Sequence, residues 1–172
     1  SQLAAPEESL RGPLQLGAVL RGEAEAHSLL ATGVNAEGCH LPPCAQLAAG
    51  SHHTLALTQR GLVLSCGKGS SGVLGHGGQR QERYEEETPR LIEALAHVRV
   101  LALAGGASHS AFVTDEGHLY TCGAPHHGRL GIGDTIPATI PVTIPVRVTL
   151  PAAVRIRWVA AGADHTMAVA RD

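Results

Sequence analysis

Histidine recurs in this chain at a regular interval, and imidazole can ligate a metal, transfer protons or make structural hydrogen bonds. His53, His109 and His165 are 56 residues apart, and each follows a glycine by three positions. Ligands of one metal must converge on one point, whereas equivalent positions in successive repeats face separate partners. We therefore predict structural hydrogen bonds for the three histidines, not a shared metal site.

The cysteines are the second group with metal-binding or redox chemistry. Cys39 and Cys44 form a C-x4-C pair, but a structural zinc site needs two more ligands and no second close pair follows. Cys66 and Cys122 are expected to be buried, inert strand residues. Four scattered cysteines favour a reducing, intracellular compartment, cytoplasmic or nuclear. We expect no disulfide, no metal and no cofactor.

The remaining motifs do not indicate catalysis. The segment Gly67-Lys68-Gly69-Ser70 lacks the spacing and the following helix of a phosphate-binding loop. The glycine-rich stretches 67–78 and 123–133 are therefore predicted to be structural turns. Adjacent residues on a strand point to opposite faces, so Ser51, His52 and His53 cannot form a hydrolase site by adjacency alone. The sequence predicts a chain without catalytic residues.

An internal repeat must position these residues. The offset of 56 also pairs Thr58 with Thr114, Gly61 with Gly117, Cys66 with Cys122, and Gly75 with Gly131. Within one unit, alternating residues predict a strand at 53–58, a glycine-closed turn and a return strand at 62–66, repeated at 118–122. A small antiparallel sheet cannot bury both of its faces alone, so the units must stack on one another.

The offsets predict five segments and an all-β fold. They are a preceding half-unit or linker at 1–26, the end of a first repeat at 27–46, full repeats at 47–102 and 103–158, and the start of a truncated repeat at 159–172. The proline-rich stretch 136–145 should be extended chain at a sheet edge, because proline lacks the N–H that a central strand donates.

Composition excludes several classes of function. Hydrophobic residues make up 44% of the 172 residues, which argues against disorder along the whole chain. The net charge of -2 and an aromatic content of 2% disfavour nucleic-acid binding by phosphate contacts or base stacking. No stretch approaches the roughly 20 apolar residues of a membrane-spanning helix.

The repeated motif resembles the repeat of the regulator-of-chromosome-condensation family over about residues 27–172. The first full unit carries the motif at Ala48, Gly50, His53, Leu57, Thr58, Gly61, Gly67, Gly72, Leu74 and Gly75. The second carries it at Ala104, Gly106, His109, Val113, Thr114, Gly117, Gly123, Gly128, Leu130 and Gly131. The chain departs from the family where Cys66 and Cys122 replace a tryptophan and where Val73 and Arg129 replace a glutamine.

The resemblance implies a β-propeller, usually of seven blades of four strands each, and a protein that binds other proteins. This chain accounts for about three blades, a partial or incomplete propeller. Either further blades come from the same or another chain, or the blades form an open arc that would expose two apolar sheet faces. The predicted function is a non-catalytic protein–protein interaction platform. The alternative, implied by the resemblance alone, is a guanine nucleotide exchange factor, or part of one, for a Ran-like or Rab-like small GTPase.

Two loops hold the predicted partner-binding residues. Arg83 and Tyr84 lie in the polar loop 79–90, and His126, His127 and Arg129 lie in the second glycine-rich loop. Tyrosine and arginine are frequent at the energetic centres of interfaces. The competing interpretation of the first loop is a solvated insertion. No residue can be named from the sequence as an exchange element.

Overall fold

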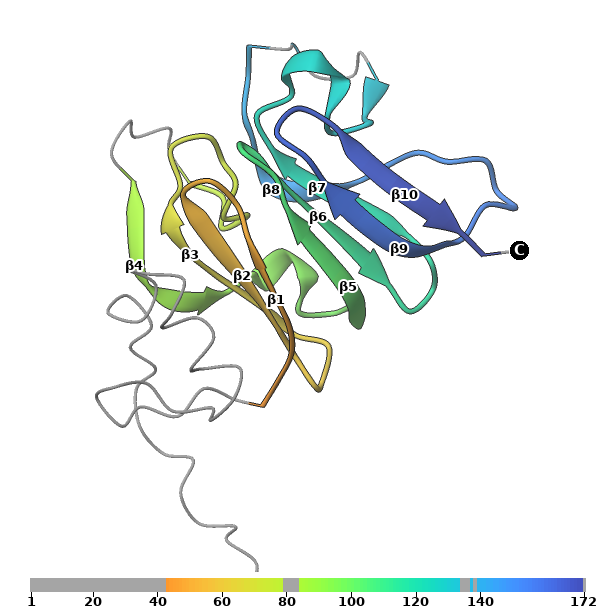
Figure 1. Cartoon of the computed structure of the whole chain (residues 1–172), viewed down its shortest axis with the longest axis horizontal. Helices are drawn as coiled ribbons and strands as arrows, with labels where there is room; N and C mark the ends of the chain where they lie inside the picture. Colours follow the sequence, from red (N-terminus) through yellow and green to blue (C-terminus); the bar gives the residue numbers. More distant parts are fainter. Residues whose placement is uncertain (1–42, 79–83, 134–136, 138, 172) are drawn as a thin grey trace, which may run out of the picture.

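The computed structural model consists of three antiparallel β-sheets and describes residues 43–78, 84–133, 137 and 139–171 (Figure 1). Blade 1 contains, in spatial order, β1 (Cys44–Ala49), β2 (His53–Thr58), β3 (Val63–Lys68) and β4 (Glu85–Leu91). Blade 2 contains β5 (Val100–Gly105), β6 (His109–Thr114), β7 (Leu119–Gly123) and β8 (Val142–Arg147). Blade 3 contains β9 (Ile156–Ala161) and β10 (Thr166–Ala170). The described residues also include the short 3-10 helices η2 (Glu93–Leu95) and η3 (His126–Gly128).

This arrangement confirms the prediction of an all-β fold built from stacked antiparallel blades. Strand β2 covers the predicted segment 53–58, and the proline-rich stretch supplies the edge strand β8. The predicted half-unit at 1–26, most of the segment 27–46 and Arg83 lie outside the described residues. The predicted unit boundaries at 47–102, 103–158 and 159–172 stay a proposal.

The hairpin turns explain one part of the repeated sequence pattern. Gly61 and Gly117 close the turns after β2 and β6 with φ of 84° and 79°, a region that side chains other than glycine rarely adopt. The hydroxyl of Thr58 accepts a hydrogen bond from the amide of Leu62 at 3.0 Å, and Thr114 does the same in blade 2. The repeated threonine and glycine are therefore turn residues.

The hydrophobic core lies between the blades. Leu55 of β2, Leu103 of β5 and Phe112 of β6 are fully buried in one cluster that joins blade 1 to blade 2. A second cluster joins blade 2 to blade 3 through Val113 and Val159, among others. Each fully buried side chain of this size contributes roughly 1.5–3 kcal/mol. The blades therefore stack face to face, as Figure 1 shows, and their hairpins point the same way.

Candidate interaction surface

A short hydrogen-bond relay connects each blade to the next. The Nε2 atom of His53 lies 2.9 Å from the hydroxyl of Ser110 in blade 2. That hydroxyl donates to the carbonyl oxygen of Val73, back in blade 1, at 2.7 Å. Because the single hydroxyl proton goes to the carbonyl, the imidazole must donate its Nε2–H to the serine oxygen. The relay thus returns to the blade in which it started.

The same relay recurs between blades 2 and 3. His109 Nε2 lies 2.8 Å from the hydroxyl of Thr166, which donates to the carbonyl oxygen of Arg129 at 2.7 Å. We call the two sets, His53–Ser110–Val73 and His109–Thr166–Arg129, the His–hydroxyl latches. For His53 and His109, they confirm the prediction that the repeated histidines make structural hydrogen bonds to separate partners.

Both latch histidines are neutral near pH 7. Burial lowers the pKa of His53 to about 4, and the nearby His109 and His52 add to the shift. Burial also lowers the pKa of His109 to about 4, with Arg129 as the next largest cause. The Nδ1 atoms of both rings are buried without a hydrogen-bond partner among the described residues. A proton on Nδ1 would therefore place an unpaired charge in the core.

The glycine three positions before each histidine has a steric role. A Cβ atom on Gly50 would overlap the ring of His53, and one on Gly106 would overlap the ring of His109. The imidazole packs against the glycine backbone, which brings Nε2 within reach of the next blade. The repeated G-x-x-H spacing is therefore a packing requirement of the latch.

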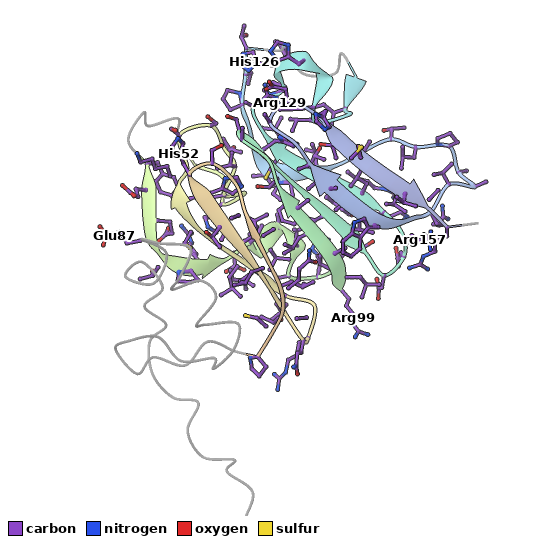
Figure 2. The ribbon with its side chains drawn as sticks, viewed as in Figure 1. His52, Glu87, Arg99, His126, Arg129 and Arg157 are labelled. Atoms are coloured by element: carbon purple, nitrogen blue, oxygen red, sulfur yellow. The ribbon has the colours of Figure 1, made fainter. Side chains whose placement is uncertain are left out.

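The latches hold one end of each blade in place. The amide of Lys68 donates to the carbonyl of His52 at 2.8 Å, and Ala124 donates to Ser108 at 2.8 Å, so each first turn is joined to the glycine-rich loop of its blade. We define the loop face as the residues at this end of the blades: 50–52, 69–78, 84, 106–108, 124–131 and 162–165. Figure 2 shows His126 and Arg129 at this end, whereas Arg99 and Arg157 point away from it.

Tyr84 lies immediately before β4 on the loop face and is half-buried. Its hydroxyl donates to the carboxylate of Glu86 at 2.9 Å, and Arg90 forms an ion pair with the same carboxylate at 3.6 Å. Burial is the main cause that raises the pKa of Tyr84, followed by the hydrogen bond to Glu86. The ring packs against Gly69, which places it beside the first glycine-rich loop.

His126 and His127 form the exposed tip of the second glycine-rich loop. His127 adopts φ of 60°, in the left-handed region, which turns the chain sharply at this point. The two ring centroids are 6.5 Å apart and inclined by 49°. The structure thus presents two imidazole rings to solvent on the loop face.

Arg129 has partners within the chain. Its side chain is 6% exposed and forms an ion pair with Asp164 of blade 3 at 2.7 Å. The guanidinium also donates to the carbonyl oxygens of His126 at 2.8 Å and Ala163 at 3.4 Å. The side chain therefore joins the second glycine-rich loop to the first turn of blade 3. Its predicted contact with a partner stays a prediction.

The remaining side chains that could bind a metal or undergo redox chemistry are buried or do not form a cluster among the described residues. Burial raises the pKa of both Cys66 and Cys122 to about 12, as expected for inert strand thiols, and both are free thiols. Among the described residues no three of His, Cys, Asp and Glu are grouped as metal ligands. No described helix is long and apolar enough to span a membrane.

Sequence reasoning missed the receiving side of the latch. A hydroxyl residue follows each repeated histidine, at Thr54, Ser110 and Thr166. This recurring pair of histidine and hydroxyl residue was a signal in the sequence from which the hydrogen-bond partner could have been predicted. A second inter-blade contact carries no such signal. The side chain of Gln46 pairs with both backbone groups of Leu103, at 2.8 and 3.2 Å, but Ala102 and Trp158 occupy the equivalent positions.

Comparison with protein families agrees with this architecture. The model of the regulator of chromosome condensation (RCC1) repeat matches residues 60–113 and 116–169, and a second RCC1 repeat model matches 44–73 and 100–129. The chain belongs to the RCC1 repeat family. Both four-stranded sheets and both latches of this RCC1-repeat chain lie within the matched residues.

Related proteins are much longer than this chain. It is 48% identical over 86 residues to the human E3 ubiquitin-protein ligase HERC2, which covers 50% of this chain and 2% of HERC2. It is 36% identical over 124 residues to the ultraviolet-B receptor UVR8 of Arabidopsis thaliana, covering 72% of this chain and 26% of UVR8.

A solved structure shares the fold. In the crystal structure of Kap60 bound to yeast RCC1 (Prp20), the match has a TM-score of 0.63 and 26% sequence identity. It covers 74% of this chain and 30% of that chain. The likeness supports stacked propeller blades, and the two proteins are similar over only part of the yeast protein.

Proposed function

We propose that this chain is a non-catalytic interaction platform that binds another protein through its loop face. The observation that carries the proposal is the coupling of the loops to the blade stack. The backbone carbonyls of Val73 and Arg129, both in glycine-rich loops, accept a hydrogen bond from the latch hydroxyl of the following blade. The loops are thereby held in one geometry before a partner arrives, which lowers the entropic cost of binding.

The exposed chemistry of the loop face suits a protein partner. Tyr84 offers a large amphipathic ring, and His126 and His127 offer exposed imidazoles. Tyrosine is enriched at interface centres, and histidine can donate and accept hydrogen bonds. A similar protein, yeast RCC1, is solved in complex with Kap60, which supports a protein as the partner of this chain. The residues proposed to contact the partner are Tyr84, His126 and His127, with Arg83 as the sequence-based addition.

Matched substitutions at the two ends of the blades test the loop face. His126→Glu places a negative charge on the loop face, and His97→Glu places the same charge on an exposed histidine in the connector that follows η2. We expect pull-downs quantified by mass spectrometry to lose their specific proteins with His126→Glu and to keep them with His97→Glu. Equal recovery with both variants would exclude binding through the second glycine-rich loop.

The family resemblance also supports a narrower function, nucleotide exchange on a small GTPase of the Ran or Rab type. Exchange needs only a surface that binds the nucleotide-free GTPase best, so it is compatible with a face that lacks catalytic groups. Release of a labelled guanine nucleotide from Ran-like and Rab-like GTPases measures this activity directly. A platform without exchange activity would bind in the pull-down and leave the release rate unchanged.

A further inference from the structure

The end of the blades opposite the loop face carries a group of arginines. We define the turn face as the residues at this end: 59–61, 93–99, 115–118, 151–157 and 171. All its arginines are exposed: Arg60, Arg99, Arg155, Arg157 and Arg171. Figure 2 shows Arg99 and Arg157 directed away from the loop face. The whole chain has a net charge of -2, so these cations are a local excess at one end of the blades.

Two of these arginines occupy the same position in successive blades. Arg99 and Arg155 are 56 residues apart and immediately precede β5 and β9. The carbonyl oxygen of Arg99 accepts a hydrogen bond from the amide of Asp115 at 2.9 Å, and that of Arg155 accepts one from the amide of Arg171 at 2.6 Å. The backbone of each arginine is thus fixed against the end of the second strand of its own blade.

The turn glycines fix the side chains of the same two arginines. A Cβ atom on Gly61 would lie 2.5 Å from Cγ of Arg99, and one on Gly117 would lie 2.8 Å from Cβ of Arg155. The aliphatic stem of each arginine therefore packs across the turn of the preceding blade. The guanidinium of Arg155 also donates to the carbonyl oxygen of Ala152 at 2.7 Å. Because the stems are packed, less side-chain entropy is lost when the exposed head groups bind.

No arginine of the turn face forms an ion pair among the described residues, although Glu93, Asp115 and Glu116 lie on the same face. Glu116 pairs with the ring of His118 at 3.2 Å. The guanidinium of Arg171 donates to the backbone carbonyl of Asp115 at 3.4 Å and not to its carboxylate. The guanidinium groups are therefore available to the carboxylates of another molecule.

The charge pattern of the turn face favours an acidic protein segment over a nucleic acid. Apart from histidine, its basic side chains are all arginine, whose planar head group binds a carboxylate through two parallel hydrogen bonds. The two hairpin turns differ in sign, with Arg60 in the first and Asp115 and Glu116 in the second. A phosphate backbone is negative throughout and would be repelled at the second turn, whereas a polypeptide can present carboxylates at the arginines alone.

We propose that the turn face binds an acidic segment of a partner protein. Carboxylates of the segment pair with Arg60, Arg99 and Arg155, and the excess positive charge speeds the encounter. The site lies at the opposite end of the blades from the loop face and does not depend on the proposed function. Loop-face partners are measured by the pull-down with His126→Glu, so either proposal can fail without the other.

Fluorescein-labelled hexaglutamate with an amidated C-terminus is the direct probe of the turn face, and its fluorescence anisotropy with the purified chain measures binding. We expect saturable binding that weakens by about tenfold or more between about 10 mM and about 150 mM sodium chloride, because salt screens exposed charges. The absence of salt-dependent binding at chain concentrations up to about 1 mM would overturn the proposal.

A pair of double variants separates the turn face from the net charge of the chain. Arg99→Gln with Arg155→Gln keeps the aliphatic stems on the turns and should weaken hexaglutamate binding by about fivefold or more. Lys68→Gln with Arg90→Gln removes the same two charges from exposed residues outside the turn face and should leave binding unchanged. Equal weakening by both double variants would overturn the proposal. So would tighter binding of heptathymidylate, which carries the same number of negative charges, because the face would then recognise phosphates.

Discussion

Replacing Ser110 by alanine should test the latch most sharply. The Ser110 hydroxyl is fully buried, accepts the Nε2–H of His53 at 2.9 Å and donates to Val73 at 2.7 Å. Alanine removes one oxygen atom, which leaves the imidazole N–H without a partner and leaves the Val73 carbonyl with only the weak Cys122 Sγ donor at 3.6 Å.

The cost follows from the two groups that lose the hydroxyl as their partner. A buried polar group without a hydrogen bond costs about 1–3 kcal/mol. Partial relaxation between the blades reduces the sum, so we expect the free energy of unfolding to fall by about 2–4 kcal/mol. For a chain of this size the melting temperature should then fall by roughly 5–15 °C. Thr166→Ala should cost less, about 1–2 kcal/mol, because Thr166 is only partly buried.

Urea unfolding followed by circular dichroism measures the free energy of unfolding of both variants. An unchanged dependence of that free energy on urea concentration would show that unfolding exposes the same amount of surface. Ser110→Thr is the matched control, since threonine fills the same role at position 166. It keeps the hydroxyl and should retain most of the stability. The reasoning is refuted if Ser110→Ala costs less than about 0.5 kcal/mol, or if Ser110→Thr is as destabilising as Ser110→Ala.

Three further predictions concern the same junctions. Folding lowers the pKa of His53 and of His109 from 6.5 to about 4, so protonation favours the unfolded chain. The free energy of unfolding should therefore be highest above about pH 6.5 and should fall as the pH approaches 4, by up to about 3 kcal/mol for each histidine. A urea midpoint that is flat from pH 7 to pH 5 would contradict this. Gly50→Ala should lower the free energy of unfolding by about 2–4 kcal/mol, because the added Cβ would overlap the His53 ring. Gly128→Ala is the control: Gly128 has φ of 69° and open space around it, so the substitution should cost about 1 kcal/mol. Equal urea midpoints for the two variants would disprove the steric argument. Arg129→Leu removes the ion pair to blade 3 and should speed amide exchange in β9 and β10 but not in β2, whereas uniform exchange rates would assign the arginine no role in holding blade 3.

The repeated residues could be predicted from the sequence because each follows a local rule. The turn after β2 requires a left-handed φ, which Gly61 adopts. The ring of His53 requires glycine at position 50, because a Cβ there would overlap the ring. Such requirements act within a few residues, so they leave the same letters at the same spacing in every unit. The all-β fold, the strand at 53–58 and the edge position of the proline-rich stretch follow from them.

Contacts that occur once could not be predicted in this way. No local pattern indicated that the guanidinium of Arg129, a predicted partner-binding residue, would bind Asp164, 35 positions later. Neither residue recurs at the offset of 56, where Val73 and Ser108 stand instead. The pairing depends on the rotation of blade 3 against blade 2, which no local pattern encodes. The same holds for Gln46 and its two bonds to the backbone of β5.

The path of the latch links blade stacking to the shape of the loop face. If the residue of blade 2 that binds His53 made no further hydrogen bond, the contact would hold the sheets together and leave the first glycine-rich loop unrestrained. Instead the Ser110 hydroxyl binds both the histidine of β2 and the carbonyl of Val73, which lies in that loop. A change at the blade junction is therefore transmitted to a carbonyl within four residues of Gly69, against which Tyr84 packs. Partner binding on the loop face and stability of the junction should consequently change together in the latch variants, although no latch side chain lies on the exposed surface of the loops.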